Sequence, residues 1–382
     1  MTVVGDNCGV QNEQYCIDFE DVLTASKRIK GIAYRTPVLT SNSLNESCPK
    51  NGYRLFFKVE AMQRTGSFKF RGALNATLNL LENIASKNDE YLEGHKDSNK
   101  TEINVVTHSS GNHAAALALA AKVSSNPKIS VRATIVMPKN APIIKKNGVK
   151  GFGGEIVLVE STNEAREEMA DVIVRDRGAF FIHPSEDKNV IAGQGTASLE
   201  FVEQVREIQS NQSISSINEN PLDVVIIPVG GGGLASGSTI ALRGLFGDNI
   251  KVILAEPSEM DDAKRSKDAG KLLGHDADNK LQSVADGLKT TLGPNTWPIV
   301  RDLVDDIFTV TEEEILFATK IIWERLKICI EPSAGVGVAV ALKTEFAEKY
   351  TRINENVNVG VILCGGNVDI IKLGKLWDEK EI

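Results

Sequence analysis

The strongest constraint on the fold is the order in which apolar strands and helices repeat along the chain. Between about residue 53 and residue 370, short apolar runs alternate with stretches of helical periodicity. Most of the runs are rich in Val and Ile throughout, a pattern typical of strands buried on both faces. This order predicts an α/β fold with a mainly parallel sheet. Strands are predicted at 54–59, 103–107, 133–137, 156–159, 223–229, 251–255 and 358–363, and helices at 114–122, 164–177, 197–208 and 312–327.

The length and composition allow a large core. The chain has 382 residues, of which 42% are hydrophobic, enough for two lobes rather than one. Two polar stretches, 86–102 and 209–220, are predicted to be surface insertions because they lack apolar groups to offset the entropy of ordering.

The charge and the cysteines exclude several classes of protein. A formal charge of −8 argues against a nucleic-acid partner, which needs a basic surface. The five cysteines are scattered without a C-x-x-C pair, so neither a disulfide framework nor a zinc site is expected, and a reducing compartment fits better. The start of the chain does not resemble a secretory signal, and no apolar run approaches membrane-spanning length. We therefore expect a soluble, cytoplasmic protein that does not bind membranes.

A run of glycines, Gly230, Gly231, Gly232 and Gly233, followed by Leu234, comes directly after the strand predicted at 223–229. Consecutive glycines let backbone N–H groups converge on an anion, and the following helix N-terminus adds positive potential, so a phosphate site is predicted. The alternative is a tight turn without a ligand. The run matches neither G-x-G-x-x-G nor a P-loop, which disfavours a dinucleotide or a nucleoside triphosphate here.

Two further turns follow predicted strands, at the edge where α/β sheets place ligands. The first is H-S-S-G-N-H, residues 108–113, whose hydroxyls, amide and helix N–H groups could bind a carboxylate. Alternatively, Ser109 or Ser110 is a plain helix N-cap. The second is C-G-G-N, residues 364–367; alone it is a weak signal, because buried cysteines are usually inert.

Lys69 lies between two phenylalanines in S-F-K-F-R-G-A, residues 67–73. Partial desolvation between aromatic rings would lower the pKa of its amine and favour Schiff-base formation. An ordinary surface lysine is the alternative if this motif is taken alone.

Together and in this order, the four motifs resemble those of the fold type II pyridoxal-phosphate enzymes, the tryptophan synthase beta-like fold. Within this family the likeness is greatest to the serine racemases, with the threonine and serine dehydratases next. It runs from about residue 17 to the C-terminus and includes T-P-V at 36–38, A-G-Q-G-T at 192–196, A-E-P-S at 255–258 and A-D-G at 285–287. The resemblance implies two lobes, each with a mainly parallel sheet flanked by helices, and a homodimer. Residues 1–81 and 183–382 would form the large cofactor-binding domain, and residues 82–182 a small mobile domain.

The resemblance also implies a role for each matched residue. Lys69 would hold pyridoxal 5'-phosphate as a Schiff base, Phe68 would pack against its ring, and Asn112 would bond its 3-hydroxyl. Residues 230–234 would hold the phosphate, and Cys364 would face the ring nitrogen. A neutral thiol there should leave the ring nitrogen largely unprotonated, which restrains deep carbanion chemistry but permits proton transfer at Cα and loss of a β-hydroxyl.

Racemisation requires an acid or base on each face of Cα, and the resemblance assigns these roles to Lys69 and Ser110. Dedicated dehydratases commonly have alanine at the position of Ser110, although the related 3-hydroxyaspartate dehydratases keep a serine. Ser109, Asn112 and His113 would bind the substrate carboxylate, with Arg166 approaching from the smaller lobe. His183 is interpreted as a structural histidine.

Serine racemases also hold a divalent cation, and residues 255–262 match that segment. The side chains of Glu256 and Asp262 and the carbonyl of Met260 would be oxygen ligands for Mg²⁺, Ca²⁺ or Mn²⁺. Without the resemblance, such an acidic loop would be interpreted as solvated. Two departures matter: Ser185 replaces an asparagine near the cofactor of the animal racemases, and Ala115 replaces a glutamine near their ATP site. These put the first contact and the role of ATP as an effector in doubt.

Three hypotheses follow. The first is an enzyme that racemises serine and also eliminates water from it, giving pyruvate and ammonia. The second is a dehydratase proper, acting on threonine, serine or 3-hydroxyaspartate. The third is a cofactor-binding regulatory module without catalysis, which is disfavoured because each mapped chemical position carries a competent residue.

Overall fold

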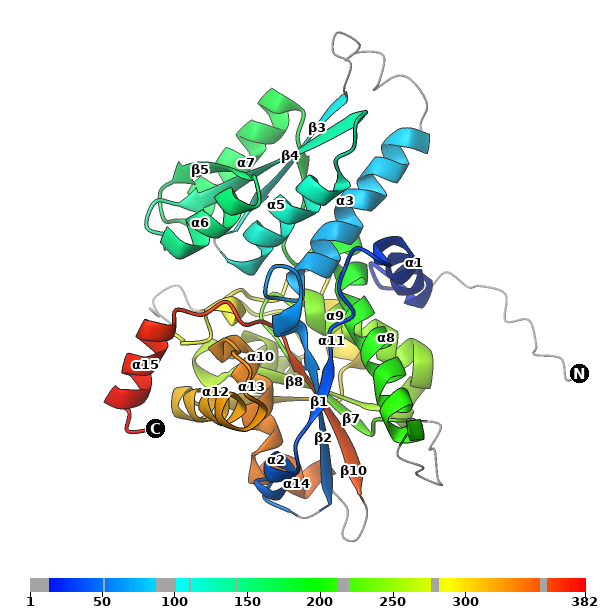
Figure 1. Cartoon of the computed structure of the whole chain (residues 1–382), viewed down its shortest axis with the longest axis vertical. Helices are drawn as coiled ribbons and strands as arrows, with labels where there is room; N and C mark the ends of the chain where they lie inside the picture. Colours follow the sequence, from blue (N-terminus) through cyan, green and yellow to red (C-terminus); the bar gives the residue numbers. More distant parts are fainter. Residues whose placement is uncertain are drawn as a thin grey trace, which may run out of the picture.

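The computed structural model of the chain describes residues 14–50, 52–86, 101–109, 111–141, 143–211, 220–275, 282–350 and 356–382. They form two sheets with helices around them, one sheet above the other in the view of Figure 1. The fold type II architecture expected from the sequence is confirmed.

The larger sheet has six strands in the order β1-β2-β10-β7-β8-β9. Only the β1–β2 pairing is antiparallel; the other four pairings are parallel. The strands are β1 (Val38–Thr40), β2 (Tyr53–Val59), β7 (Val224–Pro228), β8 (Lys251–Pro257), β9 (Asp306–Val310) and β10 (Val357–Leu363). Every residue of β7 and β10 is buried, which confirms the prediction of strands covered on both faces.

The smaller sheet has four strands in the order β5-β4-β3-β6, and all of its pairings are parallel. The strands are β3 (Thr101–His108), β4 (Ile129–Pro138), β5 (Glu155–Val159) and β6 (Phe180–Phe181). All seven predicted strands are confirmed, with differences at their ends; β1, β6 and β9 were not predicted.

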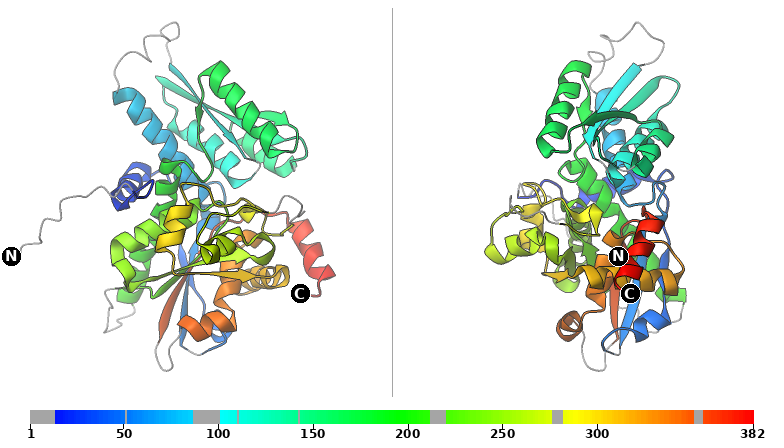
Figure 2. Two further views of the ribbon diagram at one scale, coloured as in Figure 1. Left: turned by 180° about the vertical axis from the view of Figure 1, so that it is seen from behind. Right: turned by 90° about the vertical axis from the view of Figure 1, so that its left-hand side faces the viewer.

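Helices cover both sheets, as the views from behind and from the side show (Figure 2). One of them, α13, is buried at all ten residues and packs against β7, β8 and β10. The α-helices are α1 (Phe19–Ile29), α2 (Asn42–Glu46), α3 (Lys69–Ser86), α5 (Asn112–Ser124), α6 (Ile143–Gly151), α7 (Asn163–Arg177), α8 (Lys188–Asn211), α9 (Gly233–Phe246), α10 (Asp262–Ala269), α11 (Trp297–Leu303), α12 (Glu312–Leu326), α13 (Pro332–Ala341), α14 (Thr344–Tyr350) and α15 (Ile370–Glu379). The 3-10 turns are η1 (Glu60–Met62), η2 (Gly247–Asn249), η3 (Ser258–Met260) and η4 (Asp286–Leu288). Among the described residues, no helix has both the length and the apolar character needed to cross a membrane.

One of the predicted surface insertions begins too early. Helix α8 continues to Asn211, and the side chain of Gln209 is buried and donates a hydrogen bond to the Pro221 carbonyl at 2.8 Å. The amide of Gln209 thus satisfies a loop carbonyl instead of facing water, which a count of polar residues does not reveal. The remainder of that stretch, 212–219, and residues 87–100 of the other lie outside the described residues.

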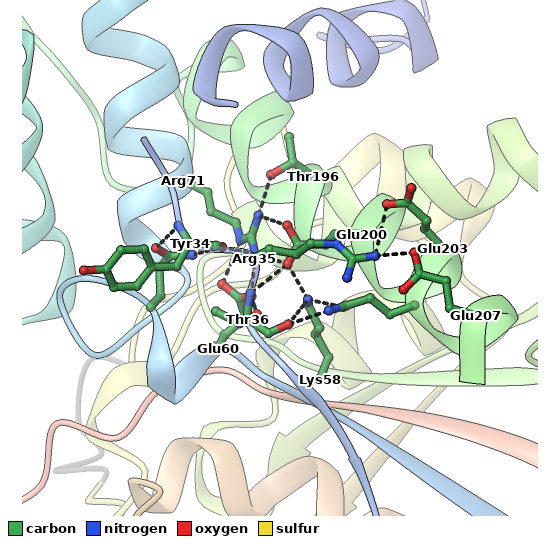
Figure 3. A network of polar contacts seen from close by, with 12 residues as sticks. Tyr34, Arg35, Thr36, Lys58, Glu60, Arg71, Thr196, Glu200, Glu203 and Glu207 are labelled. Carbon is green, nitrogen blue, oxygen red and sulfur yellow. Dashed lines mark hydrogen bonds and ion pairs between the residues drawn. The ribbon is translucent and has the colours of Figure 1, made fainter. Parts of the chain in front are cut away.

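A buried ion network joins the start of α3 to the larger sheet (Figure 3). Arg71, on the first turn of α3, contacts Glu60 of η1 at 2.8 Å and Glu200 of α8 at 2.9 Å. Burial by itself would raise the pKa of Glu60, but the charge of Arg71 and its hydrogen bond lower it. Lys58 of β2 completes the network through Glu200 and a bond of 2.6 Å to Gln204. Each buried charge therefore has a partner of opposite sign.

Replacing Arg71 by Met should lower the free energy of unfolding by about 3–5 kcal/mol, because Glu60 would stay buried without its cation. Arg35, drawn in the same network, is a matched control: its guanidinium is half exposed and pairs with Glu207 at 2.7 Å. Arg35→Met should cost about 1 kcal/mol or less. Urea denaturation measures both, and equal losses would contradict the account.

Candidate active site

A cavity of about 540 Å³ opens where several strands end. It is lined by the turns that follow β3, β7 and β10 and by the start of α3. The turns predicted from the sequence as ligand sites thus converge on one cavity. The predicted residues that line it are Phe68, Lys69, Ser109, Asn112, His113, Arg166, Gly230, Gly231, Gly232, Gly233, Leu234 and Cys364. Ser110 lies outside the described residues, between Ser109 and Gly111, which both line the cavity.

Lys69 is the first residue of α3. Its Nζ donates a hydrogen bond to the Pro184 carbonyl at 2.8 Å and lies 5.2 Å from the centre of the Phe68 ring. Burial lowers the pKa of Lys69 to about 8, with Cys364 acting in the opposite direction. The prediction of a desolvated lysine is confirmed, and a larger neutral fraction of this amine is available for nucleophilic attack than for a surface lysine.

The glycine run forms the loop between β7 and α9. Gly232 is the N-cap of α9 with a φ of 80°, and no side chain caps this helix, so the first-turn N–H groups have no side-chain partner. A Cβ on Gly231 would lie 2.6 Å from the Ser185 hydroxyl, and one on Gly230 would lie 2.8 Å from Leu288 Cα. The loop is therefore a backbone cradle that only glycines leave open, and it suits a phosphate.

The turn after β3 leads into α5, whose N-cap is Gly111. The Ser109 hydroxyl accepts from the backbone N–H of Gly111 at 3.3 Å, so the interpretation of Ser109 as a plain helix N-cap is wrong. His113 is buried, with Nε2 3.3 Å from the Ile182 carbonyl and Nδ1 without a partner among the described residues. Burial puts the pKa of His113 well below its usual value, so its ring is neutral.

Arg166 and His183 form part of the cavity wall. Arg166 lies on α7 and donates to the Thr162 carbonyl at 3.2 Å. The Nδ1 of His183 accepts from the backbone N–H of Ser185 at 3.2 Å and of Glu186 at 2.9 Å, as a structural histidine does. Burial and the neighbouring His108 lower the pKa of His183 to about 4. Although the sequence assigned it no role, its neutral ring faces the cavity.

Cys364 directly follows β10 and is 2% exposed. Burial, and then the proximity of Glu331, raise the pKa of the thiol well above its usual value. Cys364 therefore keeps its proton near neutral pH, as a neutral partner at the cavity requires.

Sequence reasoning missed several residues at the cavity. Glu331 is buried in its wall and accepts a hydrogen bond from the Asn112 amide at 2.8 Å. Lys145 of α6 forms an ion pair of 2.5 Å with Asp286 of η4, and both side chains line the cavity. The position of Glu331 was the available signal, because a single carboxylate stands between Ile330 and an apolar helix that begins with Pro332.

The acidic segment after β8 is not solvated, contrary to the alternative interpretation. Glu256 and Asp262 are each 1% exposed. Glu256 accepts from the backbone N–H groups of Ala263 and Lys264 at 2.9 Å, and Asp262 lies 3.7 Å from the Nε2 of His275. In the part of the chain that the structure describes, no three His, Cys, Asp or Glu side chains are grouped as a metal site.

Comparisons with known proteins agree with this geometry. Residues 29–365 match the model of the family described as pyridoxal-phosphate dependent enzyme. The chain is 43% identical to a serine racemase of Arabidopsis thaliana, over 96% of this chain and 97% of that one. It superimposes on maize serine racemase with a TM-score of 0.78 at 39% identity, covering 96% and 98% of the two chains. For the serine racemase of Dictyostelium discoideum the TM-score is 0.76 at 41% identity, covering 93% and 100%, and for a bacterial-type threonine deaminase from T.th. it is 0.75 at 35% identity, covering 93% and 99%.

The chain belongs to the family of pyridoxal-phosphate-dependent enzymes. The residues at the cavity fit this cofactor: the desolvated amine of Lys69 suits its aldehyde, and the cradle of glycines 230–233 suits its phosphate.

Proposed function

We propose that the chain interconverts L- and D-serine and also eliminates water from serine, giving pyruvate and ammonia. The observation that carries the proposal is the convergence of Lys69, the glycine cradle and the neutral Cys364 on one cavity, in a chain 43% identical to a serine racemase. The second candidate is a dehydratase acting on threonine, serine or 3-hydroxyaspartate, which the likeness to a threonine deaminase favours. Ser110, where dehydratases commonly have alanine, supports the first.

Pyridoxal phosphate, when bound, supplies the electron sink that makes the Cα–H of an attached amino acid acidic. Lys69 would accept and return the Cα proton at Nζ, and its pKa of about 8 suits proton transfer in both directions near neutral pH. The hydroxyl of Ser110 would hold a proton on the opposite face of Cα. The thiol of Cys364 would face the ring nitrogen without donating its proton.

The substrate carboxylate would be held at the start of α5. Its first-turn N–H groups are not capped by a side chain, and Ser109, Asn112 and His113 lie beside them. Arg166 lines the same cavity from α7 and would add a positive charge.

We propose the division of the chain into residues 1–81 with 183–382 and residues 82–182, the second unit closing over the substrate. The ion pair between Lys145 and Asp286 supports it, because it connects α6, beside the smaller sheet, with η4 across the cavity. Closure would exclude water from the reacting groups.

We also propose a divalent cation at Glu256, Asp262 and the Met260 carbonyl, with Mg²⁺ the first candidate and Ca²⁺ or Mn²⁺ alternatives. Two carboxylates that are each 1% exposed favour a cation between them, because burying like charges without a counter-ion is costly.

Further proposals rest on the resemblance alone: the chain is a homodimer, it acts in the cytoplasm, and ATP is a candidate effector. Sedimentation velocity would test the dimer, and serine turnover with and without ATP would test the effector. Localisation of a tagged chain in cells would test the compartment.

The substitution Ser110→Ala should separate the two activities. Racemisation should fall by roughly 10²–10⁴-fold, because one face of Cα loses its acid, whereas elimination from L-serine, which needs only Lys69, should survive. Chiral chromatography of serine and a pyruvate assay measure the two products. Lys69→Ala is the reference variant and should abolish both.

Two outcomes would decide against this assignment. Pyruvate without any D-serine from the unaltered enzyme would refute the racemase and leave the dehydratase. Equal losses of both activities in Ser110→Ala would refute the role of Ser110 on the second face.

Removal of divalent ions by a chelator should lower both serine turnover and the melting temperature, and added Mg²⁺ should restore them. A ligand present at 100 times its Kd stabilises by about 2.7 kcal/mol. Asp262→Asn should abolish this response. Asp261→Asn is the matched control, because Asp261 pairs with Arg265 at 2.7 Å and should leave the response intact. A melting temperature insensitive to chelation would exclude the cation.

A further inference from the structure

We propose that Glu331 and Asn367 are positioning residues that fix the amide of Asn112, so that one of its N–H groups is always presented to the cofactor's 3-hydroxyl. This inference rests on the proposed function, since it assumes that pyridoxal phosphate occupies the cavity with its 3-hydroxyl near Asn112.

The orientation of the Asn112 amide follows from a chain of hydrogen bonds. The Nδ2 of Asn367 donates to the carbonyl of Thr65 at 2.8 Å, and a carbonyl can only accept, so the Asn367 amide cannot be flipped. The same Nδ2 donates to the Oδ1 of Asn112 at 2.9 Å. The remaining end of the Asn112 amide is therefore its Nδ2, which donates to Glu331 at 2.8 Å.

These hydrogen bonds use only part of the donor capacity of Asn112. Its Nδ2 has two hydrogens, and among the described residues Glu331 is the acceptor for one of them. The second hydrogen stays available at the cavity that Asn112 lines. If the Asn112 amide were flipped, its oxygen would face the Glu331 carboxyl and its nitrogen would meet the donor of Asn367.

Two glycines make room for these hydrogen bonds. Gly66 has a φ of 74°, and a Cβ there would lie 2.4 Å from the Oδ1 of Asn367. A Cβ on Gly365 would lie 2.4 Å from the Oε1 of Glu331 and 3.3 Å from the Nδ2 of Asn112. Gly66 directly precedes the motif that contains Lys69, and Gly365 belongs to the motif that contains Cys364, so the same segments also shape the support of Asn112.

The carboxyl group of Glu331 is not used by its own helix. Glu331 is the N-cap residue of α13, yet its side chain makes no capping hydrogen bond there. The group is buried, with 3% of the residue exposed, and it is directed at Asn112 instead. Burial raises the pKa of Glu331 to about 8, so the carboxyl is mostly neutral near pH 7, and its oxygen accepts from Asn112 in either protonation state.

The test compares three holoenzyme variants by the absorption spectrum of the bound cofactor without substrate and by kcat and KM for serine. Glu331→Ala removes the acceptor and should shift the absorption band and lower kcat roughly tenfold with KM little changed. Asn367→Ala removes the other contact and should shift the band in the same way. Glu331→Gln keeps an acceptor oxygen and should restore both the band and kcat.

Asp18→Ala is the matched control, because Asp18 caps α1 through its side chain and does not line the cavity. It should lower the melting temperature without moving the band. If Glu331→Ala behaves like Asp18→Ala, losing stability with an unshifted band and unchanged kcat, the inference is overturned while the proposed function stands. If Glu331→Ala does not fold, an unshifted band in Asn367→Ala overturns it. An unaltered chain that binds no cofactor would refute the proposed function itself.

Discussion

The buried contact between Arg71 and Glu60 is the interaction on which the geometry of the cavity depends. It joins the first turn of α3, the helix that begins with Lys69, to the end of β2, and Glu200 extends the same network to α8. A lysine held by a helix anchored in this way keeps its Nζ at one point of the cavity. The other groups of the site are placed relative to that point by β3, β7 and β10, whose parallel order brings their carboxyl ends to the cavity.

Burial is the common cause of the electrostatics of the site. It lowers the pKa values of Lys69 and His113 and raises those of Cys364 and Glu331. All four shifts favour the uncharged forms of the side chains. A cavity whose walls are largely neutral can exchange single protons with a substrate near neutral pH, and it leaves the charges of a bound phosphate and carboxylate to the helix N-termini and Arg166.

Much of this organisation could be predicted from the sequence, for identifiable physical reasons. The strands in the middle of the sheets are β-branched and buried on both faces, so β7 and β10 were predicted, whereas the three-residue β1 and two-residue β6 carry too little periodicity. Gly230 to Gly233 and Lys69 were predicted because their motifs are local in the sequence. Glu331 and Asn367 act through contacts with residues more than 200 positions away, which no local pattern reveals. Gln209 was misjudged for the same reason, since its partner is a loop carbonyl.

The account is tested most directly by locating the cofactor on the chain. Borohydride reduction of the holoenzyme would turn a lysine Schiff base into a stable secondary amine, and peptide mass spectrometry would identify the modified residue. We predict that the pyridoxyl group is found on Lys69. Modification of a different lysine, or no modification of a chain that has bound the cofactor, would contradict the account.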